Sequence, residues 1–161
     1  MNAVISIDAD LRHLSAILRH IENVRDNCSL LGERLISNDE KELGIALIGL
    51  GQIHDASKIT NKLEFQHLRT DEAGSPEFKM AVLSHVTTNL HHPEAWNGIE
   101  EMPRLYVAEM VCDWKARSSE FGSDVLNWIR ERATKRFQFS TSGRVYKEIR
   151  EFVGIVCDKA F

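Results

Sequence analysis

The chain has 161 residues, of which 43% are hydrophobic and 27% are charged, a composition typical of a globular protein that buries a core. The formal net charge of −4 gives no general attraction to nucleic acid, so we expect no binding to a duplex. The most apolar stretch, residues 43–53, contains three glycines and is too short to span a bilayer. The N-terminus lacks the basic start and apolar run of a signal peptide. We therefore expect a cytoplasmic protein of one domain, without a membrane partner.

Two long helices are predicted in the first part of the chain. Between residues 11 and 35, apolar side chains recur every three or four positions, the spacing of an amphipathic helix. Asp8 or Asp10 could cap its start. A second helix is predicted over residues 39–57, and its middle is apolar on nearly every face. Such a helix is usually buried, so we expect it to be central, with His54-Asp55 at its inner end.

The rest of the chain predicts shorter helices. Residues 59–74 predict a polar connection with one helical turn, and Ser75 then caps a helix that stops at His91 or His92. Later helices are predicted over 103–120, 123–137 and 141–157. No segment favours a strand, so we predict an all-α bundle of about five to seven helices. Its core should lie within about residues 8–140, followed by a C-terminal helix over about 141–158.

The three cysteines, Cys28, Cys112 and Cys157, are widely spaced and include no C-x-x-C pair. Their odd number argues against a disulfide framework, and their spacing argues against a zinc finger. We expect all three to be reduced thiols in or near the core.

Side chains that can bind a metal ion stand in apolar parts of several predicted helices. The candidate ligands are His20, His54, Asp55, His85, His91, His92 and Asp113. Transition metals favour imidazole and carboxylate ligands, and a helix bundle can supply these from several helices at once. A carboxylate in an apolar run, such as Asp113, needs a charged partner. We predict a site for one or two divalent transition-metal ions: manganese, iron, cobalt, nickel or zinc.

Residues near these ligands are candidates for catalysis and substrate binding. Lys58 lies one helical turn beyond Asp55, where its cation could hold an anionic group against the metal. Glu109 shares a helix face with Asp113, so it could orient a ligand or act as a base. The catalytic candidates are thus Asp55, Lys58 and Glu109. The substrate-binding candidates are Lys58, Asn89, Trp96, Lys115 and Arg136.

Two of these candidates have an alternative interpretation. Trp96 could stack on a base, but an aromatic residue at such a position is more often part of the core. Arg136 belongs to a basic cluster near the end of a predicted helix. That cluster could steer an anionic substrate, or it could be a solvated face favoured by the helix dipole.

The order of the candidate ligands resembles the HD superfamily of metal-dependent phosphohydrolases, whose signature is H…HD…D on an all-α core. Here the signature stands as His20, His54-Asp55 and Asp113. Residues 91–103 also resemble the HHE…DG…P part of HD-GYP phosphodiesterases. The GYP triplet is absent, and the spacing from His85 to the following histidine pair is much shorter than in those proteins. We therefore do not expect hydrolysis of cyclic di-GMP.

A more extensive resemblance, over about residues 17–140, is to a small family of HD-like proteins from bacteria and their viruses. Its motifs are H-I-x-x-V, H-D-x-S-K, G-S-x-E-(F/Y)-K, N-x-H-H-P-E, N-G-I-x-x-M and E-M-x-C-D-W-K-A. They correspond in order to His20–Val24, His54–Lys58, Gly74–Lys79, Asn89–Glu94, Asn97–Met102 and Glu109–Ala116. The resemblance implies a single HD-like domain over residues 1–161.

By similarity to the wider superfamily, one metal ion would be bound by His20, His54, Asp55 and Asp113. Asp55 would bridge to a second ion held by His85 and by His91 or His92. The resemblance thus implies a phosphohydrolase that uses metal-activated water, with a small phosphorylated substrate, above all a nucleotide.

Two other functions remain open. One is a di-iron oxygenase on the same scaffold, and the other is a module that binds nucleotide or metal without turnover. If no metal is bound, the cluster would be a buried hydrogen-bond network. We also leave open a homodimer.

Overall fold

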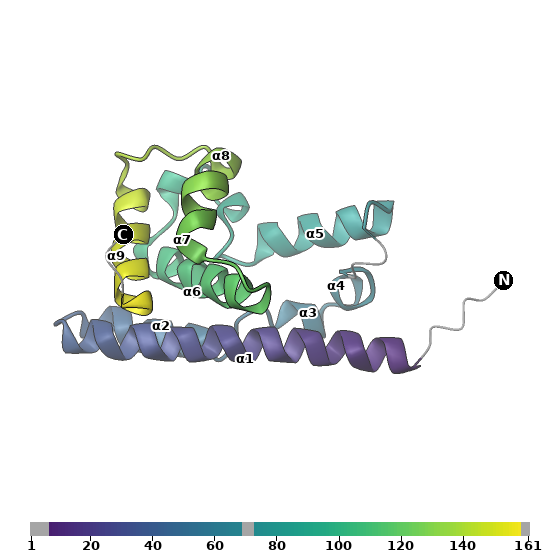
Figure 1. Ribbon diagram of the computed structural model, residues 1–161. Helices are drawn as coiled ribbons and strands as arrows, with labels where there is room; N and C mark the ends of the chain where they lie inside the picture. The colour runs from purple at the N-terminus through teal and green to yellow at the C-terminus, as the bar shows by residue number, and fades with distance from the viewer. Residues whose placement is uncertain (1–6, 69–72, 159–161) are drawn as a thin grey trace.

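The computed structural model describes residues 7–68 and 73–158, and within these ranges it contains helices and turns but no strand. The predicted all-α fold class is thus confirmed. The long helix α1 (Ile7–Ser37) runs along one side of the molecule, and the other helices lie against it or above it (Figure 1). The longer of these are α2 (Lys41–Gly51), α5 (Pro76–Thr88), α6 (Arg104–Glu120) and α9 (Arg144–Cys157). The shorter ones are α3 (Ser57–Thr60), α4 (Lys62–His67), η2 (Pro93–Ala95), η3 (Ile99–Glu101), α7 (Val125–Trp128), η4 (Ile129–Ala133) and α8 (Thr134–Phe137).

The central helix is α6, which packs against α1, α2, α7 and α9. Its middle is buried on nearly every face, from Val107 to Cys112. The prediction that residues 39–57 form the central helix is therefore wrong. α2 packs against α1 and α6 alone among its major contacts, and it leaves Ile45 54% exposed. Its apolar sequence indicates what it could bury, but no neighbouring element covers its outer face.

α1 and α2 approach each other closely because glycines stand at their contact. A Cβ atom on Gly44 would meet the backbone oxygen of Gly32 and would lie 2.7 Å from Ile36 Cγ1. Backbone atoms cannot move aside as a flexible side chain can. The glycines therefore set the spacing between the two helices that lead into the His54-Asp55 turn.

Gly44→Ala should lower the free energy of unfolding by about 1–3 kcal/mol, because the added methyl group overpacks the helix contact. Gly49 lies in the same helix, but a Cβ atom added there would have no neighbour within 4 Å. Gly49→Ala should instead raise stability by about 0.5–1 kcal/mol, the helix preference of alanine over glycine. Urea denaturation of both variants checks this. Equal effects would show that the contact does not govern the helix spacing.

Two helices end earlier than predicted, and both differences matter for the candidate ligands. α2 ends at Gly51, and residues 52–56 form a turn in which Asp55 has a left-handed backbone with φ of 53°. Aspartate tolerates this conformation better than most residues. α5 ends at Thr88 because Asn89 Nδ2 donates to the carbonyl oxygen of His85 at 2.9 Å. His91 therefore lies in a turn and not on α5.

The C-terminal part largely follows the prediction. Asp124 Oδ1 accepts from the backbone N–H groups of Leu126 and Asn127, so it caps a helical run over residues 125–137 as expected. The middle of that run is the π-helix η4, which the periodicity did not indicate. α9 begins at Arg144, slightly later than predicted. It buries five side chains in the same core as α1 and α6, so the core does not stop near residue 140: Val145, Ile149, Phe152, Val153 and Val156.

Two further expectations can be compared with the structure. All three cysteines are free, with Cys28 and Cys112 buried and Cys157 partly buried, as predicted. Among the helices described, none combines the length and the apolar character needed to cross a membrane.

Candidate metal centre

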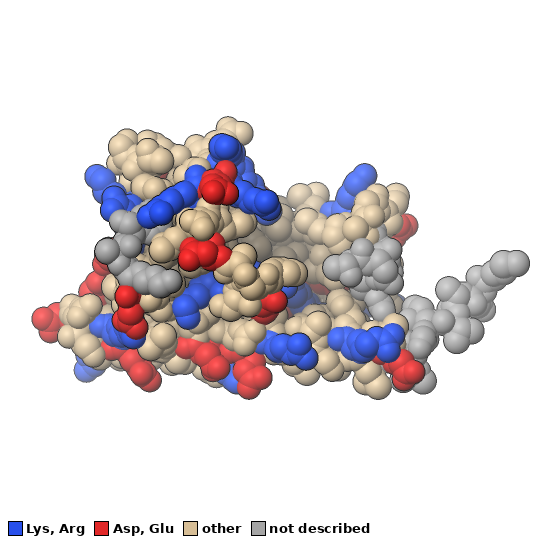
Figure 2. All heavy atoms as spheres, viewed as in Figure 1, with Lys and Arg blue, Asp and Glu red and all other residues tan. Residues whose placement is uncertain are grey.

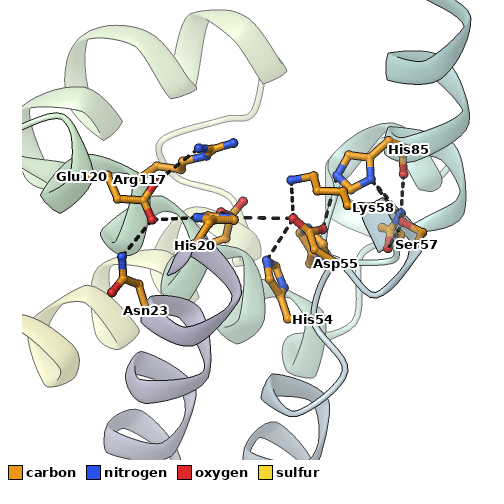
Figure 3. Close-up of polar contacts among 12 residues, drawn as sticks. His20, Asn23, His54, Asp55, Ser57, Lys58, His85, Arg117 and Glu120 are labelled. Atoms are coloured by element: carbon orange, nitrogen blue, oxygen red, sulfur yellow. Dashed lines mark hydrogen bonds and ion pairs between the residues drawn. The ribbon is translucent and has the colours of Figure 1, made fainter. Parts of the chain in front are cut away.

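Four predicted ligands meet between α1, α6 and the turn after α2. His20 Nε2 on α1 lies 3.1 Å from Asp113 Oδ1 on α6 and 3.7 Å from Asp55 Oδ2. His54 Nε2 lies 3.5 Å from the same Asp55 oxygen. Figure 3 shows the rings of His20 and His54 on either side of this carboxylate. We call these four residues subsite 1.

The other oxygen of Asp55 faces a second group of histidines. Asp55 Oδ1 lies 3.3 Å from His85 Nε2 and 3.5 Å from His91 Nε2. His92 Nε2 is 3.1 Å from His85 Nε2, so the two rings point at a common position. In these four residues, one nitrogen or oxygen from each lies within 4.8 Å of the others. We call Asp55, His85, His91 and His92 subsite 2, and Asp55 joins it to subsite 1.

Several inward-facing atoms of both subsites are buried without a hydrogen-bond partner. They are His20 Nε2, His54 Nε2, His91 Nε2, Asp55 Oδ1 and Asp113 Oδ1. A buried polar atom without a partner is costly, and proteins rarely leave one so. Neutral imidazole nitrogens and carboxylate oxygens are the ligands that divalent transition metals take. The donor set therefore fits a metal ion, and the structure brings all seven predicted ligands together.

The opposite nitrogen of three histidines is backed by a glutamate. The pairs are His20 Nδ1 with Glu120 Oε1 at 2.9 Å, His54 Nδ1 with Glu109 Oε1 at 3.0 Å, and His85 Nδ1 with Glu64 Oε2 at 3.0 Å. Metal-binding histidines commonly place their second nitrogen on a carboxylate, which fixes the ring and makes it a better ligand. Each pair thus orients an Nε2 atom towards the cluster.

Sequence reasoning missed two of these three glutamates. Glu64 is fully buried and also accepts from the hydroxyl groups of Ser57 and Ser84. Nothing in its polar surroundings in the sequence indicates burial. Glu120 stands seven residues after Asp113, two helical turns along the same face of α6, and this spacing could have revealed it.

Glu109 was predicted either to orient a ligand or to act as a base. Its Oε1 atom lies 3.0 Å from His54 Nδ1 and 3.6 Å from His91 Nδ1, behind both rings. The carboxylate is thus engaged on the far side of the histidines from the inward-facing atoms. This geometry favours the orienting role.

Opposite charges keep the two aspartates ionised. Burial opposes ionisation of Asp55, but Lys58 and then His54 outweigh it and hold the pKa of this carboxyl well below its usual value. Burial also opposes ionisation of Asp113, where the hydrogen bond with His20 and the charge of His54 lower the pKa. Both carboxylates are therefore available as anionic ligands at neutral pH.

The histidines of subsite 2 are held neutral. Burial lowers the pKa of His85 and of His91, and it lowers the pKa of His92 to about 3, helped by His91 and His85. His54 differs, because Asp55 and the hydrogen bond with Glu109 outweigh burial and raise its pKa. Neutral imidazole is the form that binds a metal.

The metal-free protein should lose thermal stability, by several degrees, between about pH 7 and about pH 5. His85, His91 and His92 bind protons more weakly folded than unfolded, so their contribution falls as pH drops below the unfolded pKa. His54 has the opposite sign, since its raised pKa favours the folded state at low pH. Three groups outweigh one. Scanning calorimetry in chelator checks this, and His92→Asn should flatten the slope. A melting temperature that rises on acidification would contradict it.

The substrate-binding candidates divide into two sets. Lys58 Nζ pairs with Asp55 Oδ2 beside both subsites, as predicted. Asn89 instead lies behind His85, with Nδ2 3.1 Å from His85 Nδ1. Lys115 Nζ donates to Asn27 Oδ1 at 2.7 Å, and this contact does not bring it to the cluster. Trp96 donates from Nε1 to the carbonyl oxygen of Leu90 and packs against the core, which is its alternative interpretation.

Arg136 lies in an exposed basic cluster near the loop that carries subsite 2. Its Nη2 is 3.5 Å from Oε1 of Glu94, which follows the histidine pair on η2. The exposed basic members are Arg130, Arg132, Lys135 and Arg136. Figure 2 shows basic side chains gathered around α7 and α8. The cluster thus remains a candidate for steering an anion, at the surface and not among the ligands.

Fold and site together define an all-α protein with a buried histidine–aspartate cluster that could hold a metal ion. A model of a family of unknown function (DUF5662) matches residues 9–159, and the chain belongs to this family. No curated protein and no solved structure matches the chain. The matched range includes every residue of both subsites.

Proposed function

We propose that the chain is an HD-type metal-dependent phosphohydrolase that acts on a small phosphate ester, with nucleotides as the leading substrate class. One observation carries the proposal: two groups of inward-facing ligand atoms share Asp55, and several of these atoms are buried without hydrogen-bond partners. The order His20, His54-Asp55 and Asp113 supports it, because this order is similar to the HD signature.

One or two divalent transition-metal ions held by the two subsites would supply a water acidified enough to attack phosphorus near neutral pH. The protein groups have separate tasks around it. Asp55 presents one oxygen to each subsite and is placed to take the proton of that water. Glu64 and Glu109 hold the rings of His85 and His54 in orientation from behind.

Lys58 is the cation beside the reacting position in this proposal. Its ammonium group contacts Asp55 Oδ2, and its side chain is 12% exposed, so it stands at the edge of the buried cluster. A fixed positive charge there would neutralise charge that develops on the phosphoryl oxygens. Binding of substrate phosphate would give this ammonium a second anionic partner.

Lys58→Ala should lower kcat/KM for p-nitrophenyl phosphate by about 100-fold, the usual cost of removing one such charge-stabilising group. Metal content should stay unchanged, because subsites 1 and 2 do not include this lysine. Lys62→Ala is the matched control, since Lys62 lies four residues further along the chain and belongs to neither subsite. Activity should be measured with metal-loaded protein. Absence of hydrolysis by the wild type with manganese, iron, cobalt, nickel or zinc would contradict the proposed activity.

The second candidate function is a di-iron oxygenase. The observation that favours it is the number of histidines, five, whose rings lie in one cluster around Asp55: His20, His54, His85, His91 and His92. Imidazole nitrogen suits iron as well as zinc or nickel. Iron in the purified protein with an oxygen-dependent colour change would favour oxidation, whereas turnover of a phosphate ester would favour hydrolysis.

A further inference from the structure

The segment that carries Lys58 and His85 contributes almost nothing to the hydrophobic core. We call α3, α4 and α5 the arm, and α1, α2, α6, α7 and α9 the body. Among the described residues of the arm helices, the buried ones are Glu64, Ala81 and His85, and Ala81 alone is apolar. The main core includes no residue of the arm. Apolar packing therefore does little to fix the arm on the body.

The arm keeps much of its apolar surface in solvent. Ile59 is 41% exposed, Met80 is 53% exposed and Leu83 is 62% exposed. Its helices contact chiefly one another and η2. In Figure 1, α5 extends away from α7 and α8, and the outline in Figure 2 is notched between them. The arm thus resembles a separate layer more than a part of the body's core.

Few described contacts join the arm to the rest of the chain. The rings of His13 on α1 and Phe65 on α4 lie 5.9 Å apart. The other connection is polar, because Lys58 and His85 both reach Asp55. Without a metal ion, His85 meets this carboxylate as a neutral ring in a poorly satisfied cluster. Such a connection is weak, and segments held by few apolar contacts open locally at low cost.

We propose that an ion in subsite 2 fastens the arm to the body, so that metal binding controls the order of the arm. This inference rests on the metal site proposed above. An ion there would join two networks that are otherwise separate. On the arm, His85 is held by Glu64 and Ser57. On the body side, His91 Nδ1 faces Glu109 on α6.

The consequence is an activity site that forms fully only with metal. Lys58 stands on the arm, so its position relative to subsite 1 depends on how the arm is attached. Loss of the ion from subsite 2 would release both His85 and the cation that faces the substrate. Subsite 1 takes its ligands from α1, α6 and the turn after α2, and so does not need the arm.

Hydrogen–deuterium exchange of the full chain tests this, with chelator in one sample and Mn²⁺ in the other. At a free ion concentration about 100 times Kd, backbone amides of α4 and α5 should exchange up to about 100-fold more slowly, since binding lowers the opening equilibrium by this factor. Amides of α6 and α9 should change little. Bound manganese should be measured in the same samples by elemental analysis.

Two variants sharpen the test. His85→Ala should remove the protection of the arm by Mn²⁺, while α6 and α9 keep their slow exchange, which shows that the body remains folded. His92→Ala should act in the same direction, because it removes another ligand of subsite 2. His67→Ala is the matched control, since this histidine is on α4 but outside both subsites. It should keep the full effect.

Two results would overturn the inference, and they differ in meaning. If manganese binds but arm exchange stays the same, the fastening role is wrong and the metal site stands. If no manganese binds at any concentration, both the fastening role and the proposed metal site fail.

Discussion

Asp55→Ala should abolish metal binding at both subsites and lower any hydrolytic activity by about 1,000-fold. The reason is geometric, because Asp55 alone presents an oxygen to each group: Oδ2 faces His20 and His54, and Oδ1 faces His85 and His91. Its removal also takes away the anion that balances Lys58. Elemental analysis after reconstitution and a phosphatase assay measure the two effects.

The control for this variant must account for backbone strain. Asp55 has a φ of 53°, so alanine there costs stability for reasons unrelated to metal. Asp39 has a similar backbone, with a φ of 67°, but it is distant in sequence from the candidate ligands and belongs to neither subsite. Asp39→Ala should lower stability modestly and leave metal content unchanged. Wild-type metal content in Asp55→Ala would contradict the bridging role.

Glu109→Gln should weaken metal affinity by about 10-fold to 100-fold, the usual effect of removing a carboxylate that orients a histidine ligand. Glu109 Oε1 faces the Nδ1 atoms of both His54 and His91, so one substitution loosens a ligand in each subsite. Glutamine keeps the size of the side chain, so the core around it should hold its packing. Competition with a metal-sensitive dye gives the affinity.

Glu101→Gln is the matched control, because Glu101 is exposed on η3. It removes the same charge from the chain and should leave affinity unchanged. If Glu109→Gln binds metal as tightly as the control, the glutamates behind the histidines do not support the ligands, and the orienting role assigned to them is wrong.

The sequence predicted the ligands of the cluster better than it predicted the elements that hold them. His20 and Asp113 stand on α1 and α6, where regular helical spacing made the buried face readable. His54 and Asp55 were expected at the end of a helix, but they lie in a turn. One left-handed aspartate changes the chain direction there, and helical periodicity carries no signal for a single backbone conformation.

The position of α2 shows a second limit. Its apolar sequence predicted burial on every face, yet Ile45 and Ile53 are exposed. Periodicity describes which faces of a helix can be buried, and only the number of neighbouring elements decides which of them are. The same limit hid Glu64, whose burial depends on α4 and α5 packing against each other.

The polar connection between arm and body also lay beyond sequence reasoning. Ile59, Met80 and Leu83 are the kind of residue expected in a core, and the structure leaves them exposed. The histidines that the motifs assign to metal binding instead occupy the junction. Chemistry and attachment are thus combined in the same residues, and a motif identifies only the first of these roles.

Metal analysis of the wild-type protein, purified without chelator, tests the metal centre most directly. We predict about one to two equivalents of a divalent transition metal per chain, by elemental analysis, because neutral imidazoles and ionised aspartates bind such ions strongly near neutral pH. Absence of bound metal, even after reconstitution with manganese, iron, cobalt, nickel or zinc, would contradict it. The cluster around Asp55 would then be a structural hydrogen-bond network, and neither the hydrolase nor the oxygenase could stand.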